Sequence, residues 1–473
     1  MVKKKNILFY GLLITAVFFF FISLSQTATR YNLNQQLAIS DKILNKKNNI
    51  YPPKEFTYHK ETTVSQYPPG IAIIITPINF FIPNDVIKNI IYALIAVISH
   101  FSLLIILAII HSRISGSKLS ISFFLCLIFS LLISKSYSFY SLELKPDTLA
   151  FSLGLWAIFL AKLDKKDLVN PIRNIVLGIF FGMFLIFKQQ YITFLFGIVL
   201  YNIFFFCKKK TNFIAGAILS STTVLIIFGN IENFWFWNIT TFQDDGFMTF
   251  AKYLNKNIFL YFNFFLFYLV VINIQFQRIT ITKVYSFLKN YLKLMNNHYT
   301  WILIVAASGC FLSGLKNGGN TSNTGIALML LSPLVFSIIK NFKAKWLKIF
   351  LFFGIISILP FTIKSVNNLK LFYSLKSKFT EQNIDHNKVV GYGSTFYSIV
   401  KNNKKIILHD YWTNAQRNGI RLSESLEEML KEKYFDFILI ESYLLDSLEK
   451  QASGSYEILA QNELGALIKK ISF

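Results

Sequence analysis

Long apolar stretches separated by short polar ones follow one another along most of the chain. Most of them approach the length that crosses a bilayer as a helix, about 20 residues. The pattern predicts helices over residues 7–25, 86–111, 119–135, 147–161, 174–188, 190–206, 213–229, 256–275, 299–315, 324–340 and 346–363. The predicted fold class is therefore an α-helical polytopic membrane protein with about eleven transmembrane helices.

Basic residues fall in every second loop between these helices. They are Lys3, Lys4 and Lys5, then Arg113 and Lys118, Lys162 to Arg173, Lys208 to Lys210, Arg278 to Lys293, and Lys340 to Lys348. Because loops rich in lysine and arginine stay in the cytoplasm, the N-terminus is predicted inside and the chain after residue 363 outside. Topology thus accounts for most of the net charge of +24, and a nucleic-acid partner is not indicated.

The composition agrees with a membrane protein. Hydrophobic residues make up 53% of the chain and there are 51 phenylalanines, more than a soluble interior can hide. The first apolar run lacks a small-x-small cleavage pattern after it, so we interpret it as an uncleaved signal anchor. The cysteines and histidines show neither disulfide nor zinc spacing.

The chain is expected to have two domains. Residues 1–363 form the transmembrane domain, including an extracytoplasmic first loop at residues 26–85. Residues 364–473 form a smaller extracytoplasmic domain, in which short apolar runs alternate with helical patterns and predict an α/β unit.

The first loop is polar, acidic and marked by proline. Its acids are Asp41, Glu55 and Glu61, and it ends in a Tyr-Pro-Pro-Gly motif that begins at Tyr67. Prolines fix the backbone locally, which suits a binding site and equally suits a plain connector. Residues 71–81 are too short to span and are interrupted by Pro77, so they are expected to lie in the interface or dip into the membrane.

A compact polar cluster precedes the predicted helix at 147–161. It contains Glu143, Lys145 and Asp147. Pro146 and Asp147 suit the first turn of a helix, which is one interpretation of the motif. The other is a site that orients an acceptor or holds a divalent metal.

Two further polar positions face the same side of the membrane. Lys188 and Gln189 interrupt an apolar pair of helices, where an amide in lipid needs a partner. Residues 313–324 form a Gly/Asn-rich turn containing Lys316 and Asn320, which is either a flexible hairpin or a phosphate cradle. Lys145, Lys188 and Lys316 together would stabilise a lipid phosphate as a leaving group.

The order of these motifs resembles the GT-C superfamily of polytopic glycosyltransferases. The resemblance covers the signal anchor, the loop ending in Tyr-Pro-Pro-Gly, the Pro-Asp helix start, the Lys-Gln pair and the late Lys-Asn-Gly-Gly-Asn turn, over residues 1–363. It is greatest for the bacterial branch related to protein mannosyltransferases and lipid A aminoarabinose transferases.

The resemblance implies a sugar transfer from a polyprenyl-phosphate donor to a glycan, lipid or protein acceptor on the extracytoplasmic face of a bacterial inner membrane. The resemblance also implies that transfer is inverting and that a carboxylate of the first loop acts as base. Asp147 matches the family's acid before the fourth helix, Lys188 and Gln189 match its Lys-Gln pair, and residues 316–320 match its late turn. Glu143, Lys145 and Tyr67 are further candidates for substrate binding.

One departure from the family concerns the base. The family places an aspartate soon after the first helix, where this chain has Asn32 and Asn34. Asp41 is the nearest carboxylate and our candidate, with Glu55, Glu61 or no base as alternatives. The competing functions are a carrier-lipid flippase, a polysaccharide export component and a glycan polymerase.

Overall fold

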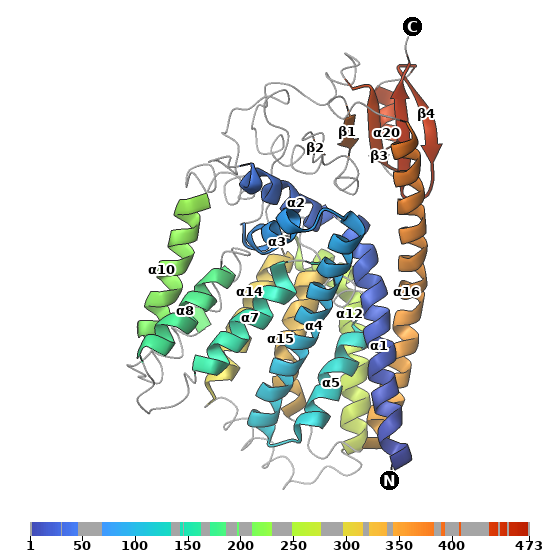
Figure 1. Cartoon of the computed structure of the whole chain (residues 1–473). Coiled ribbons are helices and arrows are strands. Elements are labelled where there is room, and N and C mark those ends of the chain that lie inside the picture. The colour runs from blue at the N-terminus through green and yellow to red at the C-terminus, as the bar shows by residue number, and fades with distance from the viewer. Residues whose placement is uncertain are drawn as a thin grey trace. The chain divides into compact units, whose positions relative to one another are not determined.

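Helices form most of the described chain, as the apolar pattern predicts (Figure 1). In this computed structural model they are α1 (Val2–Thr29), α2 (Tyr31–Leu44), α3 (Gly70–Phe81), α4 (Asp85–Ser115), α5 (Leu119–Leu132), α7 (Pro146–Ala161), α8 (Pro171–Leu185), α10 (Thr211–Phe228), α12 (Phe250–Gln275), α14 (His298–Leu315), α15 (Thr321–Ser337), α16 (Ala344–Glu381) and α20 (Leu445–Gln451). Every predicted apolar segment overlaps one of them except 190–206, of which only residues 196 and 197 are described.

The structure describes the chain with gaps. The described residues are 2–29, 31–45, 69–133, 142–144, 146–161, 171–185, 196–197, 211–228, 248–275, 297–315, 321–337, 344–382, 389–392, 406–407, 435–442, 445–451 and 454–471. The chain divides into unit 1 (Met1–Phe20, Ile95–Thr223 and Asp245–Thr362) and unit 2 (Phe21–Leu94, Val224–Asp244 and Ile363–Phe473).

Four described helices are long and apolar enough to cross a membrane. They cover Ile7–Thr29, Asp85–Ser115, His298–Leu315 and Lys345–Glu381. Shorter apolar helices cover Gly70–Phe81, Leu119–Leu132, Asp147–Ala161, Pro171–Met183, Asn212–Val224 and Asn323–Ser337. The chain is thus a multi-pass membrane protein, and the predicted polytopic helical fold class is confirmed.

Small residues allow close helix packing in unit 1. A side chain at Gly178 or Gly182 of α8 would collide with backbone oxygens of α10. The Ser220 hydroxyl of α10 donates to the Ile179 carbonyl of α8 over 2.9 Å. Small residues spaced by four let membrane helices approach closely, so this packing depends on the absence of side chains.

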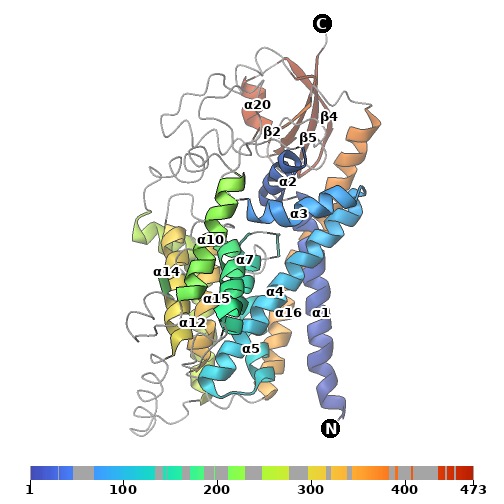
Figure 2. The same cartoon turned by 60° about the vertical axis from the view of Figure 1, so that its left-hand side comes forward.

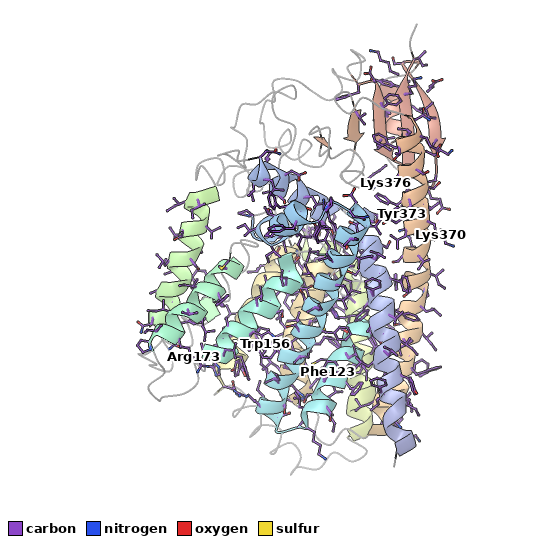
Figure 3. All side chains as sticks on the ribbon, in the orientation of Figure 1. Phe123, Trp156, Arg173, Lys370, Tyr373 and Lys376 are labelled. Atoms are coloured by element: carbon purple, nitrogen blue, oxygen red, sulfur yellow. The ribbon has the colours of Figure 1, made fainter. Side chains whose placement is uncertain are left out.

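Polar and aromatic contacts join other helices of unit 1. The indole of Trp156 on α7, which is labelled in Figure 3, donates to the Ser102 hydroxyl of α4 over 2.9 Å. The rings of Phe129, Phe267 and Phe336, from α5, α12 and α15, have centroids 5.7 to 6.0 Å apart. Buried aromatic clusters of this kind stabilise the bundle where apolar faces meet.

Unit 2 contains a mixed sheet near the C-terminus. Its strands are β1 (Val389–Tyr392), β2 (Ile406–Ile407), β3 (Phe437–Glu441), β4 (Tyr456–Gln461) and β5 (Gly465–Lys470). The five strands have the order β2-β1-β3-β5-β4. β1 is parallel to β2 and β3, whereas β5 is antiparallel to β3 and β4. The predicted α/β character of the tail is therefore confirmed, while its domain boundary at residue 363 stays a prediction.

Helix α16 is longer than its apolar run. The run ends near residue 363, but the helix continues to Glu381. The whole helix has 38 residues and is about 57 Å long. Phe372, Leu375 and Phe379 are buried at helical spacing in this extension. The Asn462 amide of the β4–β5 turn donates to the Leu371 carbonyl over 2.9 Å, which attaches the sheet to α16.

Candidate functional site

Helix α2 forms in the first loop, where the sequence predicts only a polar connection. Its buried residues Leu33, Gln36, Ile39 and Ser40 repeat at helical spacing. The Gln36 carboxamide oxygen accepts the Ala72 backbone N–H of α3 over 3.1 Å. Tertiary contacts with α3 therefore stabilise α2, a helix that its own polar sequence does not predict.

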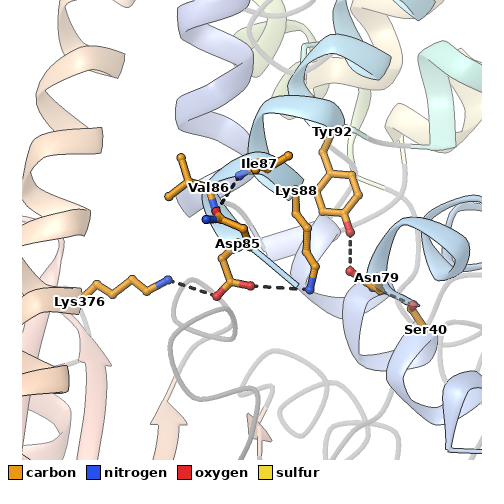
Figure 4. A network of polar contacts seen from close by, with 9 residues as sticks. Ser40, Asn79, Asp85, Val86, Ile87, Lys88, Tyr92 and Lys376 are labelled. Atoms are coloured by element: carbon orange, nitrogen blue, oxygen red, sulfur yellow. Dashed lines mark hydrogen bonds and ion pairs between the residues drawn. The ribbon is translucent and has the colours of Figure 1, made fainter. Parts of the chain in front are cut away.

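A polar network joins α2, α3 and α4 within unit 2 (Figure 4). The Asn79 amide donates to Ser40 over 2.8 Å, and the Tyr92 hydroxyl donates to the Asn79 carbonyl oxygen over 2.5 Å. The Thr76 hydroxyl also lies 3.0 Å from Ser40. These bonds fix α2 on α3 and both helices on the start of α4.

Charged residues continue the network at the start of α4. Asn84 accepts the backbone N–H groups of Val86 and Ile87, as a residue that caps a helix N-terminus does. The Asp85 carboxylate lies 3.8 Å from the Lys88 ammonium and 3.4 Å from the Lys376 ammonium of α16 (Figure 4). The ion pair with Lys376 connects the first loop to the helix that carries the tail.

Asp41, the candidate base, lies on α2 and is partly exposed. Its carboxylate and that of Asp85 both act electrostatically on the Tyr92 hydroxyl, so Asp41 lies close to the network just described. The backbone oxygen of Asp41 accepts two bonds from Asn45, at 3.0 Å and 2.7 Å, which ends the helix. A partly exposed carboxylate on an ordered helix is suited to meet a substrate hydroxyl.

Glu143 and Asp147 are four positions apart in the sequence, and both belong to unit 1. Pro146 and Asp147 occupy the first turn of α7, as their sequence predicts. The exposed fraction is 1% for the Glu143 side chain and 5% for Asp147. Burying two carboxylates at the end of a membrane helix is costly, which is a mark of functional groups in such proteins.

A second polar group in unit 1 lies where α14 ends and α15 begins. The Tyr253 and Thr324 hydroxyls of α12 and α15 lie 2.9 Å apart, and Tyr261 donates to Tyr253 over 3.0 Å. The Asn323 amide donates to Ser313 over 3.2 Å. Polar contacts therefore join the start of α15 both to α12, through Thr324, and to the end of α14, through Asn323.

Sequence reasoning missed some residues at the start of α12. Lys252 and Lys256 are exposed on the first turns of α12, one helical turn apart. The sequence feature that could have identified these two lysines is their spacing of four residues just before an apolar run. Tyr253 offered no such feature, because its partner Thr324 is distant in sequence and only the fold brings the two hydroxyls together.

The remaining site predictions lie outside the described residues. They are Tyr67, Lys145, Lys188, Gln189, Lys316 and Asn320, together with the alternative bases Glu55 and Glu61. Asp41 belongs to unit 2 and Asp147 to unit 1, and each is described within its own unit. Within the described part of the chain, no three His, Cys, Asp or Glu side chains form a group that would hold a metal ion.

Comparisons with known proteins identify the fold. No protein-family model matches the sequence, and no curated protein matches it. Among solved structures, ArnT from Cupriavidus metallidurans is similar in the apo state, with a TM-score of 0.64 at 9% identity. ArnT bound to undecaprenyl phosphate is similar with a TM-score of 0.61 at 10% identity. Both comparisons cover 98% of this chain and 98% of ArnT, so the chain has the fold of ArnT, which confirms the polytopic fold that the resemblance in the sequence implies.

Proposed function

We propose that this protein is a membrane glycosyltransferase that moves a sugar from a polyprenyl-phosphate donor to an acceptor on the extracytoplasmic face. The observation that carries the proposal is the similarity to ArnT over 98% of both chains, one of those structures being bound to undecaprenyl phosphate. A fold alone does not fix an activity. The acids Asp41, Glu143 and Asp147, each in an ordered part of that fold, add support.

The proposed reaction is an inverting displacement at the anomeric carbon of the donor sugar. An acceptor hydroxyl oxygen forms a bond to this carbon while the bond from the carbon to the phosphate oxygen breaks. The hydroxyl proton passes to a carboxylate, and the electron pair of the broken bond leaves with the carrier phosphate. The protein must therefore supply a base near the acceptor and cations near the phosphate.

Asp41 is the proposed base and Asp147 the proposed residue that orients the acceptor or a metal. Asp41 is partly exposed on α2, as a residue that must reach a substrate would be. Asp147 is buried in the first turn of α7, where burial restricts the movement of its side chain. A fixed carboxylate is suited to orientation, because positioning requires a group that does not move.

Lysines are the proposed partners of the carrier phosphate. Lys145, Lys188 and Lys316 are the candidates from the sequence, with Gln189, Asn320 and Tyr67 as further polar contacts to the substrates. Lys252 and Lys256 add exposed ammonium groups at the start of α12. Converging cations would stabilise the phosphate as its negative charge grows in the transition state.

The test uses the full chain, purified and placed in nanodiscs with a panel of polyprenyl-phosphate sugars. Release of free carrier phosphate and sugar transfer to a membrane extract are measured. We expect turnover with one donor, and loss of about 10²-fold or more in Asp147→Asn and Asp41→Asn, as for groups that act in proton transfer or orientation. Asp446→Asn is the control, since Asp446 is an exposed acid on α20.

Retained turnover in Asp147→Asn would remove Asp147 from the site, and retained turnover in Asp41→Asn would transfer the role of base to Glu55 or Glu61. Absence of turnover with every donor would instead favour a carrier-lipid flippase. One observation is in keeping with that alternative: His100 is fully buried within the long apolar helix α4, with its ring 4.8 Å from that of Phe19. Polar residues at such depth are typical of transport pathways.

A further inference from the structure

Two arginines from different helices contact consecutive residues at the end of α7, within unit 1. The Arg113 guanidinium of α4 lies over the Phe159 ring of α7, 4.3 Å from the ring centroid. The Arg173 guanidinium of α8 donates to the carbonyl oxygen of Leu160, the next residue of α7. Arginines near the ends of membrane helices commonly extend into water. These two instead lie against the same turn of a neighbouring helix.

The contacts between α4 and α7 explain why Arg113 lies over Phe159. The two helices lie side by side (Figure 2). The Ser152 hydroxyl and the Trp156 indole of α7 both donate to the Ser102 hydroxyl of α4, over 2.7 Å and 2.9 Å. The rings of Trp156 and Phe159 are in edge contact, with centroids 5.7 Å apart. These contacts fix α7 on α4, and with it the position of the Phe159 ring.

The contacts of the two arginines leave their charges unneutralised. Among the residues that the structure describes, the carboxylates in ion pairs are those of Asp85 and Glu381, and neither Arg113 nor Arg173 lies within ion-pair distance of one. An aromatic ring covers the face of a guanidinium and leaves the N–H groups at its edge available, in the fork that matches a phosphate. Both arginines are exposed. They therefore present positioned cationic donors to an anion at the surface.

An exposed apolar ridge on α8 begins beside Arg173. Its residues Ile172, Val176 and Phe180, here called the α8 ridge, lie one turn apart and have exposed fractions of 69%, 44% and 59%. The ridge extends about 12 Å along the helix. Exposed apolar surface of this kind marks contact with a membrane or another partner. An anion that binds next to such a ridge is expected to be the head group of a lipid.

We propose that Arg113 and Arg173 bind the phosphate of an anionic phospholipid whose acyl chains lie along the α8 ridge. The order of basic loops predicts that this end of α7 faces the cytoplasm, where anionic lipids give the membrane surface its negative potential. Asp147 lies at the opposite end of α7, so this lipid is not the carrier of the proposed sugar transfer. The proposal does not depend on that activity.

The first test compares two lipids with the same acyl chains. The purified chain in mild detergent is incubated with equal amounts of phosphatidylglycerol and phosphatidylethanolamine, and native mass spectrometry measures the adducts of each. We expect the parent chain to prefer phosphatidylglycerol severalfold, and the double variant Arg113→Gln, Arg173→Gln to bind both lipids equally. Lys345→Gln is the matched control, since Lys345 is an exposed cation on α16 at the same predicted side of the membrane, and it should keep the preference.

The same spectra contain the results that would overturn the proposal. Equal binding of the two lipids by the parent chain would do so, and so would an unchanged preference in the double variant. Adducts of inorganic phosphate, added alone, on a parent chain that retains no phosphatidylglycerol would show a site for a free anion and would overturn the lipid proposal equally.

A second measurement locates the lipid without any substitution, so it does not depend on how the variants fold. Phosphatidylglycerol with a photoreactive group in its acyl chain is crosslinked to the parent chain in nanodiscs. We expect crosslinks on peptides covering residues 171–185, which unlabelled phosphatidylglycerol reduces severalfold and phosphatidylethanolamine does not. Crosslinks confined to other helices would contradict the proposal, whatever the preference in the mass spectra.

Discussion

The side-chain amide of Asn79 joins the two described helices of the first loop, α2 and α3, to the start of α4. Its nitrogen donates to Ser40 of α2 and its oxygen accepts the Tyr92 hydroxyl of α4. Replacing it in Asn79→Ala removes the partner of two part-buried hydroxyls, which costs about 1–3 kcal/mol. We expect faster hydrogen exchange in the backbone amides of α2, measured by mass spectrometry of peptides covering residues 31–45.

Asn367→Ala is the matched control for this prediction. Asn367 is exposed on α16, so its replacement removes no buried hydrogen bond and exchange in α2 should not change. If Asn79→Ala left exchange in α2 at the parent rate, the amide would not be what holds α2 in place. Burial of Leu33 and Ile39 would then suffice for this helix.

At the scale of single residues, the sequence predicted local roles and missed distant partners. The Pro-Asp motif predicted a helix start at Pro146, because the preference of both residues for a first turn is local. The surroundings of Asp41 depend on Tyr92, which follows it at a great distance in the chain and reaches it only through the packing of α2 and α4. The pattern of residues along the sequence does not show such contacts.

Among the helices, the pair α8 and α10 depends most clearly on the absence of side chains. A Cβ atom at Gly182 would meet the Ala217 oxygen and the Ser220 hydroxyl of α10. Gly182→Leu must therefore separate the helices or strain them, at a cost of about 1–3 kcal/mol. We expect a lower thermal unfolding midpoint in detergent, measured by the fluorescence of a thiol-reactive dye.

Ile218→Leu provides the comparison, because Ile218 lies on the exposed side of α10, with 52% of its side chain exposed. This change keeps volume and should leave the midpoint where it is. An unchanged midpoint in Gly182→Leu would mean that α8 and α10 are held together by other contacts, such as that between Ser220 and Ile179.

The sequence predicted best those elements that are stabilised by a continuous apolar run. Helices α4 and α16 have such runs, since lipid requires an apolar surface over the whole span. Helix α2 and the extension of α16 have polar sequences with only a few spaced apolar residues, and tertiary packing stabilises them. The β4–β5 hairpin was also missed, because its short strands form through pairing with β3 rather than through their own pattern.

At the scale of the whole molecule, the order of basic loops predicts the side of the membrane on which the tail lies, which the fold alone does not determine. An odd number of crossings, with Lys3, Lys4 and Lys5 inside, would put the tail outside the cytoplasm. Alkaline phosphatase fused after Phe473 should therefore be active in bacterial cells, and green fluorescent protein fused there should be dark. A fusion after Ser115, in the predicted cytoplasmic loop between α4 and α5, should give the opposite pair of signals.

The C-terminal fusion decides the parity of the crossings, and parity depends on every span. A fluorescent fusion after Phe473 would require an even number, and residues 190–206 would be the first segment to reassign, since nearly all of it lies outside the described residues. If that segment did not cross, the basic loop at residues 208–210 would face away from the cytoplasm, against the bias of its three lysines. Agreement of both fusions with the prediction would place the sheet of the tail on the side where Asp147 opens α7, as an extracytoplasmic transfer requires.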